Sequence, residues 1–126
     1  MSEKGRDYIL FLEDIIAALD KIEKYSGNLD YEQFSGNAMV IDAVIRNFEI
    51  IGEATKSIPK EVQKRYHAVE WREAAGFRDV LIHDYFGIDI EALWDTIKQN
   101  LPSFKKHIIS ALQTELEQNK ETEGSN

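Results

Sequence analysis

The stretch from Arg78 to Tyr85 concentrates chemically active side chains: a fixed cation, an imidazole, two carboxylates and a phenol within eight residues. Asp79 and His83 are four residues apart, so in a helix they share one face, where the carboxylate can hold an imidazole N–H and favour its charged form. Arg78 is five residues from His83, which places it roughly 140° around the helix axis. A site that uses both groups is therefore a wide cleft, or is completed by a second copy of the same helix.

Arg78 and His83 match the two roles that cleavage of RNA without a metal ion requires. A base must remove the proton of the 2′-hydroxyl, and a cation must stabilise the doubly charged phosphorane that forms. An imidazole titrates near neutral pH, and a guanidinium offers a planar, permanently charged fork for two phosphate oxygens. From residue types alone a structural interpretation stays open, in which Arg78 pairs with Asp79 or Glu53 and the imidazole packs near a helix end.

The charge of the chain is unevenly spread. The net charge of −8 disfavours a protein that coats nucleic acid, because phosphate contacts need Lys or Arg. Positive residues nevertheless outnumber negative ones between Lys56 and Arg78, the segment that leads into the chemically dense stretch. We therefore predict a local positive surface, whose candidate contacts to RNA phosphates are Lys64, Arg65 and Arg72.

Apolar residues recur at helical spacing along most of the chain. The helices expected from this pattern cover residues 6–25, 38–57, 60–66, 71–85, 90–97 and 104–116, with a short turn at 30–34. Segment 38–57 is apolar on more than one side and is expected to be the central helix. Asn37 and Asp89 are predicted N-caps, Ser57 is predicted to cap the helix that follows Pro59, and Pro102 is predicted to kink or restart the chain.

Length and composition indicate one globular domain. The 126 residues suffice for a single core, and alternation of period two is absent, so we predict an all-α bundle of about five to six helices at 1–117 and a polar, disordered tail at 118–126. The absence of cysteine excludes disulfides and Cys-ligated zinc, and the three histidines lack metal-ligand spacing, so no metal or cofactor is expected. No apolar run approaches the roughly 20 residues that span a bilayer, and the start does not resemble a signal peptide, so we expect a cytoplasmic protein.

The spacing of Arg78, His83 and Tyr85 matches the R-x-x-x-x-H-x-Y signature of the HepT-like toxins, a branch of the HEPN superfamily of helical ribonucleases. The spacing from Arg to His alone is a weak signal. Further segments resemble the same family in the same order, and they are Arg6-Asp7-Tyr8, Ile51-Gly52-Glu53-Ala54, Trp71-Arg72-Glu73, Gly76-Phe77-Arg78, His83-Asp84-Tyr85-Phe86-Gly87-Ile88-Asp89 and Trp94-Asp95. The resemblance extends from about residue 6 to residue 116, and the ordered set makes it specific.

The resemblance implies an antiparallel HEPN-type bundle that forms a homodimer, with a metal-independent endoribonuclease site across the dimer interface. Arg78 and His83 correspond to the family's catalytic pair, with Asp79 as an auxiliary residue where the family often has Asn. Tyr85 corresponds to the tyrosine that a minimal nucleotidyltransferase antitoxin adenylylates in type VII HEPN/MNT toxin–antitoxin pairs, which would place a bulky anion beside His83. The alternative is a non-catalytic helical module that docks on such a nucleotidyltransferase, and the acidity of the chain favours it.

Overall fold

The computed structural model describes the backbone of residues 3–83 and 89–124 and the side chains of residues 8–77 and 89–120. Within these ranges the chain is helical and contains no strand, so the predicted all-α class is confirmed. The elements are α1 (Glu3–Ser26), α2 (Tyr31–Ser35), α3 (Ala38–Lys56), α4 (Lys60–Arg65), α5 (Trp71–His83), α6 (Ile90–Asp95), the π-helical segment η1 (Thr96–Asn100) and α7 (Leu101–Gly124). The last three follow one another without a break, and the described elements fit a HEPN-like bundle.

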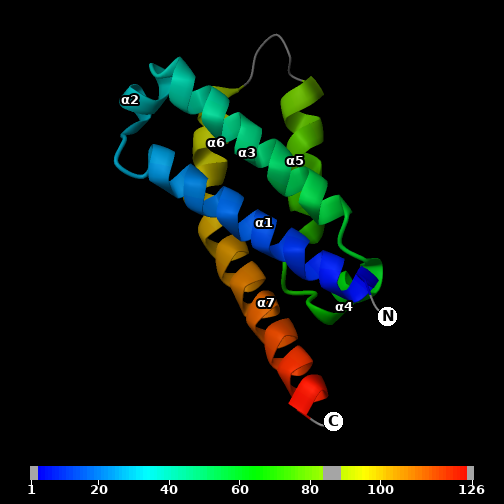
Figure 1. Cartoon of the computed structure of the whole chain (residues 1–126). Coiled ribbons are helices and arrows are strands. Elements are labelled where there is room, and N and C mark those ends of the chain that lie inside the picture. The colour runs from blue at the N-terminus through cyan, green and yellow to red at the C-terminus, as the bar shows by residue number, and fades with distance from the viewer. Residues whose placement is uncertain (1–2, 84–88, 125–126) are drawn as a thin grey trace.

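Helix α3 lies at the centre of the bundle and packs against α1 and α5 (Figure 1). Its apolar residues Val44, Phe48 and Ile51 are almost fully buried, and so is the polar Thr55. Burying a side chain the size of Phe48 or Ile51 contributes about 1.5–3 kcal/mol. Because apolar residues occupy more than one side of α3, the helix can bury itself against two neighbours at once. The prediction of a central helix is confirmed.

Helix α1 packs against α3 and also against α7, which runs away from the other helices towards the C-terminus (Figure 1). The buried stripe of α1 consists of Leu12, Ile15, Leu19 and Ile22, which recur at spacings of three and four residues. Such a stripe covers about one third of the helix circumference and leaves the remaining positions to charged residues. The opposite end of the chain reaches the same core through α7.

Local capping fixes where several helices begin. Asn37 accepts a hydrogen bond from the backbone N–H of Val40 at 3.1 Å, and Asp89 accepts one from Ala92 at 3.0 Å, so both predicted N-caps are confirmed. The predicted role of Ser57 is wrong. Ser57 ends α3 because its hydroxyl donates to a carbonyl one turn earlier in that helix, and Pro59, without a side-chain bond, precedes α4.

The chain widens into the π-helical segment η1 directly before Pro102. Proline has no backbone N–H, so it cannot donate to the carbonyl four residues earlier, and its ring crowds that carbonyl. A π-helical turn is one way in which a helix absorbs such a disturbance without breaking. The chain therefore does not restart at Pro102: η1 continues directly into α7, which begins at Leu101.

Helix α7 continues to Gly124, beyond the boundary predicted at residue 117. Residues 116–120 are exposed, so packing does not hold this last described part of the helix. The division into a domain and a polar tail stays a prediction. None of the helices in the described ranges is long and apolar enough to cross a membrane.

Candidate active site and basic groove

The backbone of α5 is helical from Trp71 to His83, so the helical register predicted for the catalytic positions is confirmed. Asp79 and His83 therefore lie about one turn apart on one face of α5, and position 78 lies roughly 140° from position 83 around the axis. The side chains of residues 78–88 lie outside the described part of the structure, and Tyr85 lies outside it altogether. The roles predicted for these residues stay predictions.

Two aromatic residues hold α5 on the bundle before these positions. Trp71 is buried and donates its indole N–H to two backbone oxygens of the preceding segment, each at 3.0 Å. Phe77 precedes Arg78 and meets Phe48 of α3 edge to face, with ring centroids 5.0 Å apart, and Phe104 of α7 at 6.3 Å. Helix α5 is thus fixed both at its start and directly before the predicted catalytic pair.

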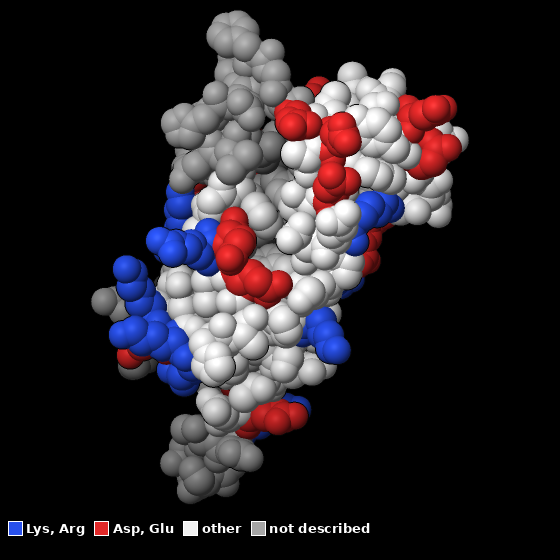
Figure 2. All heavy atoms as spheres, turned by 180° about the vertical axis from the view of Figure 1, so that it is seen from behind, with Lys and Arg blue, Asp and Glu red and all other residues white. Residues whose placement is uncertain are grey.

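A groove of about 440 Å³ lies where α4 meets the start of α5 and contains two of the three predicted RNA contacts. We call it the basic groove, and its charged or titratable lining residues are Lys60, Lys64, His67, Arg72 and Glu73. The turn between the two helices brings Lys64 and Arg72 to one surface. In the view of Figure 2, Lys and Arg side chains gather at the left edge, the side on which α4 lies.

The cations of the basic groove are not neutralised within the described part of the chain. Neither Lys60, Lys64 nor Arg72 lies within 4.0 Å of a described carboxylate. All three side chains are exposed. Their charges therefore remain available to an anionic ligand.

A second groove, of about 490 Å³ between α1 and α3, has the opposite character. Its charged lining residues are Asp14, Glu49 and Glu53 against a single cation, Arg46. Arg46 is itself 3.6 Å from Glu49. This groove repels a phosphate backbone, so the basic groove is the better candidate surface for RNA of the two.

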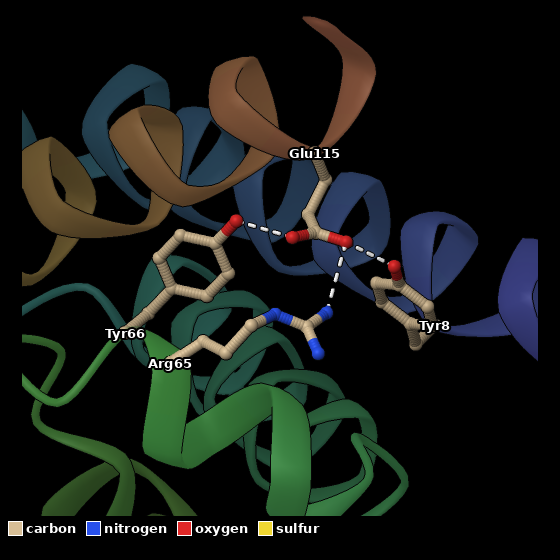
Figure 3. A network of polar contacts seen from close by, with 4 residues as sticks. All are labelled: Tyr8, Arg65, Tyr66 and Glu115. Carbon is tan, nitrogen blue, oxygen red and sulfur yellow. Dashed lines mark hydrogen bonds and ion pairs between the residues drawn. The ribbon is translucent and has the colours of Figure 1, made fainter. Parts of the chain in front are cut away.

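Arg65, the third predicted RNA contact, points away from the basic groove into a polar network around Glu115 (Figure 3). Its Nη2 donates to Oε1 of Glu115 at 3.1 Å, and the same carboxylate accepts hydrogen bonds from the hydroxyls of Tyr8 and Tyr66. The carboxylate is almost fully buried. The network joins the start of α1, the end of α4 and α7, so Arg65 has a structural partner that Lys64 and Arg72 lack.

Burial and hydrogen bonding act in opposite directions on Glu115. Burial raises the pKa of its carboxyl, but the hydroxyls of Tyr66 and Tyr8 and the charge of Arg65 outweigh it, so the pKa lies below the ordinary value. Burial, reinforced by the hydrogen bond to Glu115, raises the pKa of Tyr8 and of Tyr66 to about 12. The network is thus an ionised carboxylate held by two neutral phenols and one guanidinium.

No structural role was predicted from the sequence for Tyr8 or Glu115, although a signal for Glu115 exists. Glu115 follows Ile108 and Ala111 at seven and four residues, which is the spacing of the buried stripe of α7. A carboxylate at such a position needs buried partners, because an unpaired buried charge is costly. The partners themselves come from segments some 50 and 107 residues away, and the sequence pattern does not identify them.

A further polar contact ties α7 to the start of α5. Nδ1 of His107 lies 2.9 Å from Oε1 of Glu70, the residue that precedes α5. The contact supports the same corner of the bundle from which Trp71 anchors the helix.

Among residues 8–77 and 89–120, no three His, Asp or Glu side chains lie close enough together to share a metal ion.

The all-α bundle fits the HEPN type that the sequence resemblance implies. The family model described as "Ribonuclease HepT-like" matches residues 15–111. The chain belongs to the HepT-like ribonuclease family.

Several relatives carry ribonuclease names and match over most of their length. The "Probable ribonuclease HepT" of Thermococcus cleftensis is 43% identical over 105 residues, which is 83% of this chain and 93% of that protein. A candidate RNase of Methanocaldococcus jannaschii is 45% identical over 101 residues, covering 80% of this chain and 87% of the relative. A candidate RNase of Caldanaerobacter subterraneus is 36% identical over 105 residues, covering 83% and 94%. No solved structure matched the chain.

Proposed function

We propose that this chain is the toxin of a type VII HEPN/MNT toxin–antitoxin pair, an endoribonuclease that acts on RNA as a homodimer without a metal ion. The observation that carries the proposal is the placement of Arg78 and His83, five residues apart, on the one helix α5 of a HepT-like chain. The names of its relatives support a ribonuclease. The dimer, the metal-independent chemistry and the antitoxin are parts of the proposal that go beyond these names.

In the proposed reaction His83 accepts the proton of a 2′-hydroxyl, and the freed oxygen attacks the adjacent phosphorus. Arg78 donates hydrogen bonds to the non-bridging oxygens and stabilises the charge that builds up on them. The bond from phosphorus to the 5′-oxygen breaks, and this oxygen takes up a proton from an imidazolium or from water. The products are a 2′,3′-cyclic phosphate and a 5′-hydroxyl. Asp79, one turn before His83, orients the imidazole.

A two-fold dimer solves the geometric problem that α5 poses. Because positions 78 and 83 lie roughly 140° apart around the axis, one copy does not present both side chains in the same direction. Two copies of α5 that meet across a two-fold axis surround one cleft with two arginines and two histidines. In this arrangement the guanidinium of one copy can act beside the imidazole of the other.

The cleavage step is tested with purified protein, single-stranded RNA and EDTA. Wild type is expected to cut RNA and to leave 2′,3′-cyclic phosphate ends, whereas His83→Ala is expected to lose cleavage. His107→Ala serves as the matched control, because it removes an imidazole that contacts Glu70 rather than the proposed cleft. Equal cleavage by wild type and His83→Ala, or cleavage of a strand with 2′-deoxyribose at the cut site, would rule out this mechanism. The absence of cleavage by wild type would favour the non-catalytic module.

We further propose that a minimal nucleotidyltransferase silences the toxin by adenylylating Tyr85. An AMP group two residues from His83 would fill the cleft and repel RNA by charge. Incubation with the partner and ATP is expected to add the mass of one AMP to wild type but not to Tyr85→Phe. Tyr25→Phe, which removes a 37% exposed tyrosine from α1, is the control that keeps the modification. Modification of Tyr85→Phe to the level of wild type would place the target elsewhere.

A further inference from the structure

We propose that the basic groove binds the phosphate backbone of RNA outside the cleavage site, and that the bound strand follows the face of α5 past Gly76 towards position 83. The inference rests on the proposed ribonuclease function and adds to it the surface from which the enzyme gains affinity for its substrate. Three cationic side chains, those of Lys60, Lys64 and Arg72, line the groove against one carboxylate, that of Glu73. Each of the three is free of a described ion pair.

The groove is built on a fixed frame. Lys60 and Lys64 are four residues apart, so they project from one face of α4, while Arg72 comes from the first turn of α5. The indole of Trp71 joins the two helices, since it donates to backbone oxygens at the end of α4 and directly after it. Trp71 is only 8% exposed and offers no free face on which a base could stack. The cations of the groove are therefore suited to phosphates, and contacts to phosphates supply affinity without sequence selection.

The helical register of α5 connects the groove with the predicted catalytic positions. Position 83 follows Arg72 by eleven residues, which is about three turns, so the two lie within roughly 20° around the axis and about 16 Å apart along it. Gly76 lies on the same face between them. A Cβ built on Gly76 meets nothing within 4 Å among the described residues, so there is space beside α5 at this position. A strand held at Arg72 can therefore continue over Gly76 towards His83.

Because the molecule as a whole is acidic, its affinity for RNA depends on this local basic surface. A chain with a net charge of −8 repels a polyanion over most of its surface, so RNA is held only where cations are concentrated. The groove between α1 and α3 is acidic. The basic groove, in contrast, lies on the helix that carries Arg78 and His83.

The test measures binding of a fluorescently labelled single-stranded RNA by anisotropy at several salt concentrations. All variants carry His83→Ala as well, so that the RNA is not cleaved during the measurement. The groove variant is Lys60→Gln/Lys64→Gln, and the control is Lys21→Gln/Lys24→Gln on the exposed surface of α1 at the end distant from α4 (Figure 1). Both remove two positive charges, so effects of net charge cancel. We expect the groove variant to bind on the order of tenfold more weakly than the control, and its plot of log K against log salt to be shallower by about 1.4.

Variants of Arg65 and Gly76 provide two further controls. Arg65→Gln disturbs the Glu115 network but not the groove, so it is expected to lower the melting temperature with little change in RNA affinity. Gly76→Leu, which places a bulky side chain on the path, is expected to weaken binding several-fold relative to Gly76→Ala. Equal affinity and equal salt slope for the groove variant and the lysine control would overturn the inference, and so would equal binding by the two Gly76 variants.

The two proposals can fail separately. If the groove variants bind RNA weakly but wild type does not cleave it, the catalytic proposal fails while the RNA-binding surface stands. If wild type cleaves RNA and the groove variants cleave and bind it as the lysine control does, the catalytic proposal stands and the groove has no part in RNA binding. The absence of RNA binding by wild type would overturn both.

Discussion

The carboxylate of Glu115 has three donors and almost no contact with water, which makes it the most constrained charge among the described residues. Each donor comes from a segment that the chain must bring back to α7. Hydrogen bonds to a charged group contribute about 1.5–3 kcal/mol each to stability in favourable cases, and a donor left buried without an acceptor adds a penalty. The network therefore fixes the packing of α1 and α4 on α7 more firmly than apolar contacts alone.

Replacing Glu115 with glutamine is expected to lower the free energy of unfolding by about 2 kcal/mol at neutral pH, because the amide keeps one acceptor but loses the charge. Since the folded-state pKa of Glu115 lies below its ordinary value of 4.5, its contribution is fully present above that value and is lost as pH falls through the folded pKa. The difference between wild type and Glu115→Gln, measured in urea titrations, should therefore shrink as the pH is lowered below 4.5. A difference that stays constant with pH would contradict the assignment of an ionised carboxylate.

Thr55 shows the reverse situation, a buried polar atom without a partner. The side chain is 0% exposed, and its Oγ1 has no hydrogen-bond partner among the residues that the structure describes. Thr55→Val keeps the shape of the side chain and removes the unsatisfied hydroxyl, so it is expected to raise the free energy of unfolding by about 1 kcal/mol. Thr114→Val is the control, because that hydroxyl donates to the carbonyl of Ser110 at 3.0 Å. A loss of stability in Thr55→Val would show that the hydroxyl has a partner.

At the scale of elements, α5 combines firm anchors with one weak position. Trp71 and Phe77 fix the helix through hydrogen bonds and ring contacts, whereas Gly76 between them lowers helix propensity. A glycine inside a helix costs about 1 kcal/mol relative to alanine unless its lack of a side chain is needed for packing. Packing does not require it at Gly76, because an added Cβ meets open space.

Gly76→Ala is therefore expected to raise the free energy of unfolding by about 1 kcal/mol, seen as a melting temperature higher by a few degrees. Gly27→Ala is expected to lower the free energy of unfolding instead, because the added Cβ would lie 2.6 Å from the backbone oxygen of Glu23. Calorimetry on both variants checks the pair. A destabilised Gly76→Ala would mean that a neighbour occupies the space beside α5.

The elements that the sequence predicted correctly depend on local features. The stripe of α1, the burial of α3 and the caps Asn37 and Asp89 follow from spacing within a few residues. The π-helical segment before Pro102 was not predicted, because the sequence shows only that proline disturbs a helix and not how the helix responds. Ser57 was misassigned because the same residue type suits the end of one helix as well as the start of the next.

In the candidate site, too, the local features could be predicted and the long-range contacts could not. Helicity of the catalytic positions and the position of Lys64 and Arg72 on one surface were predictable, since these residues lie close together in the sequence. The engagement of Arg65 by Glu115 was not, because it joins residues 50 apart. Charge composition identified Arg65 as a cation but did not identify its partner. Only the packing of α4 on α7 separates it from its neighbour Lys64.

At the scale of the whole molecule, the proposed two-fold dimer makes catalysis depend on assembly. If the shared cleft uses Arg78 of one copy with His83 of the other, Arg78→Ala and His83→Ala homodimers are both expected to be inactive. Subunit exchange between the two variants creates heterodimers in which Arg78 of one copy and His83 of the other are both intact. RNA cleavage should therefore reappear when the two inactive preparations are mixed and allowed to exchange.

The control is a mixture of His83→Ala with an Arg78→Ala/His83→Ala double variant, which exchanges subunits equally well but never supplies a histidine. Cleavage at a fixed total protein amount should also fall on dilution below the dimer dissociation constant, because a monomer holds only half of the cleft. Continued inactivity of the mixed variants, with exchange verified by mass spectrometry, would show that each α5 acts with its own Arg78 and His83. The roughly 140° between them would then have to be bridged within one copy, by a substrate that wraps around the helix end.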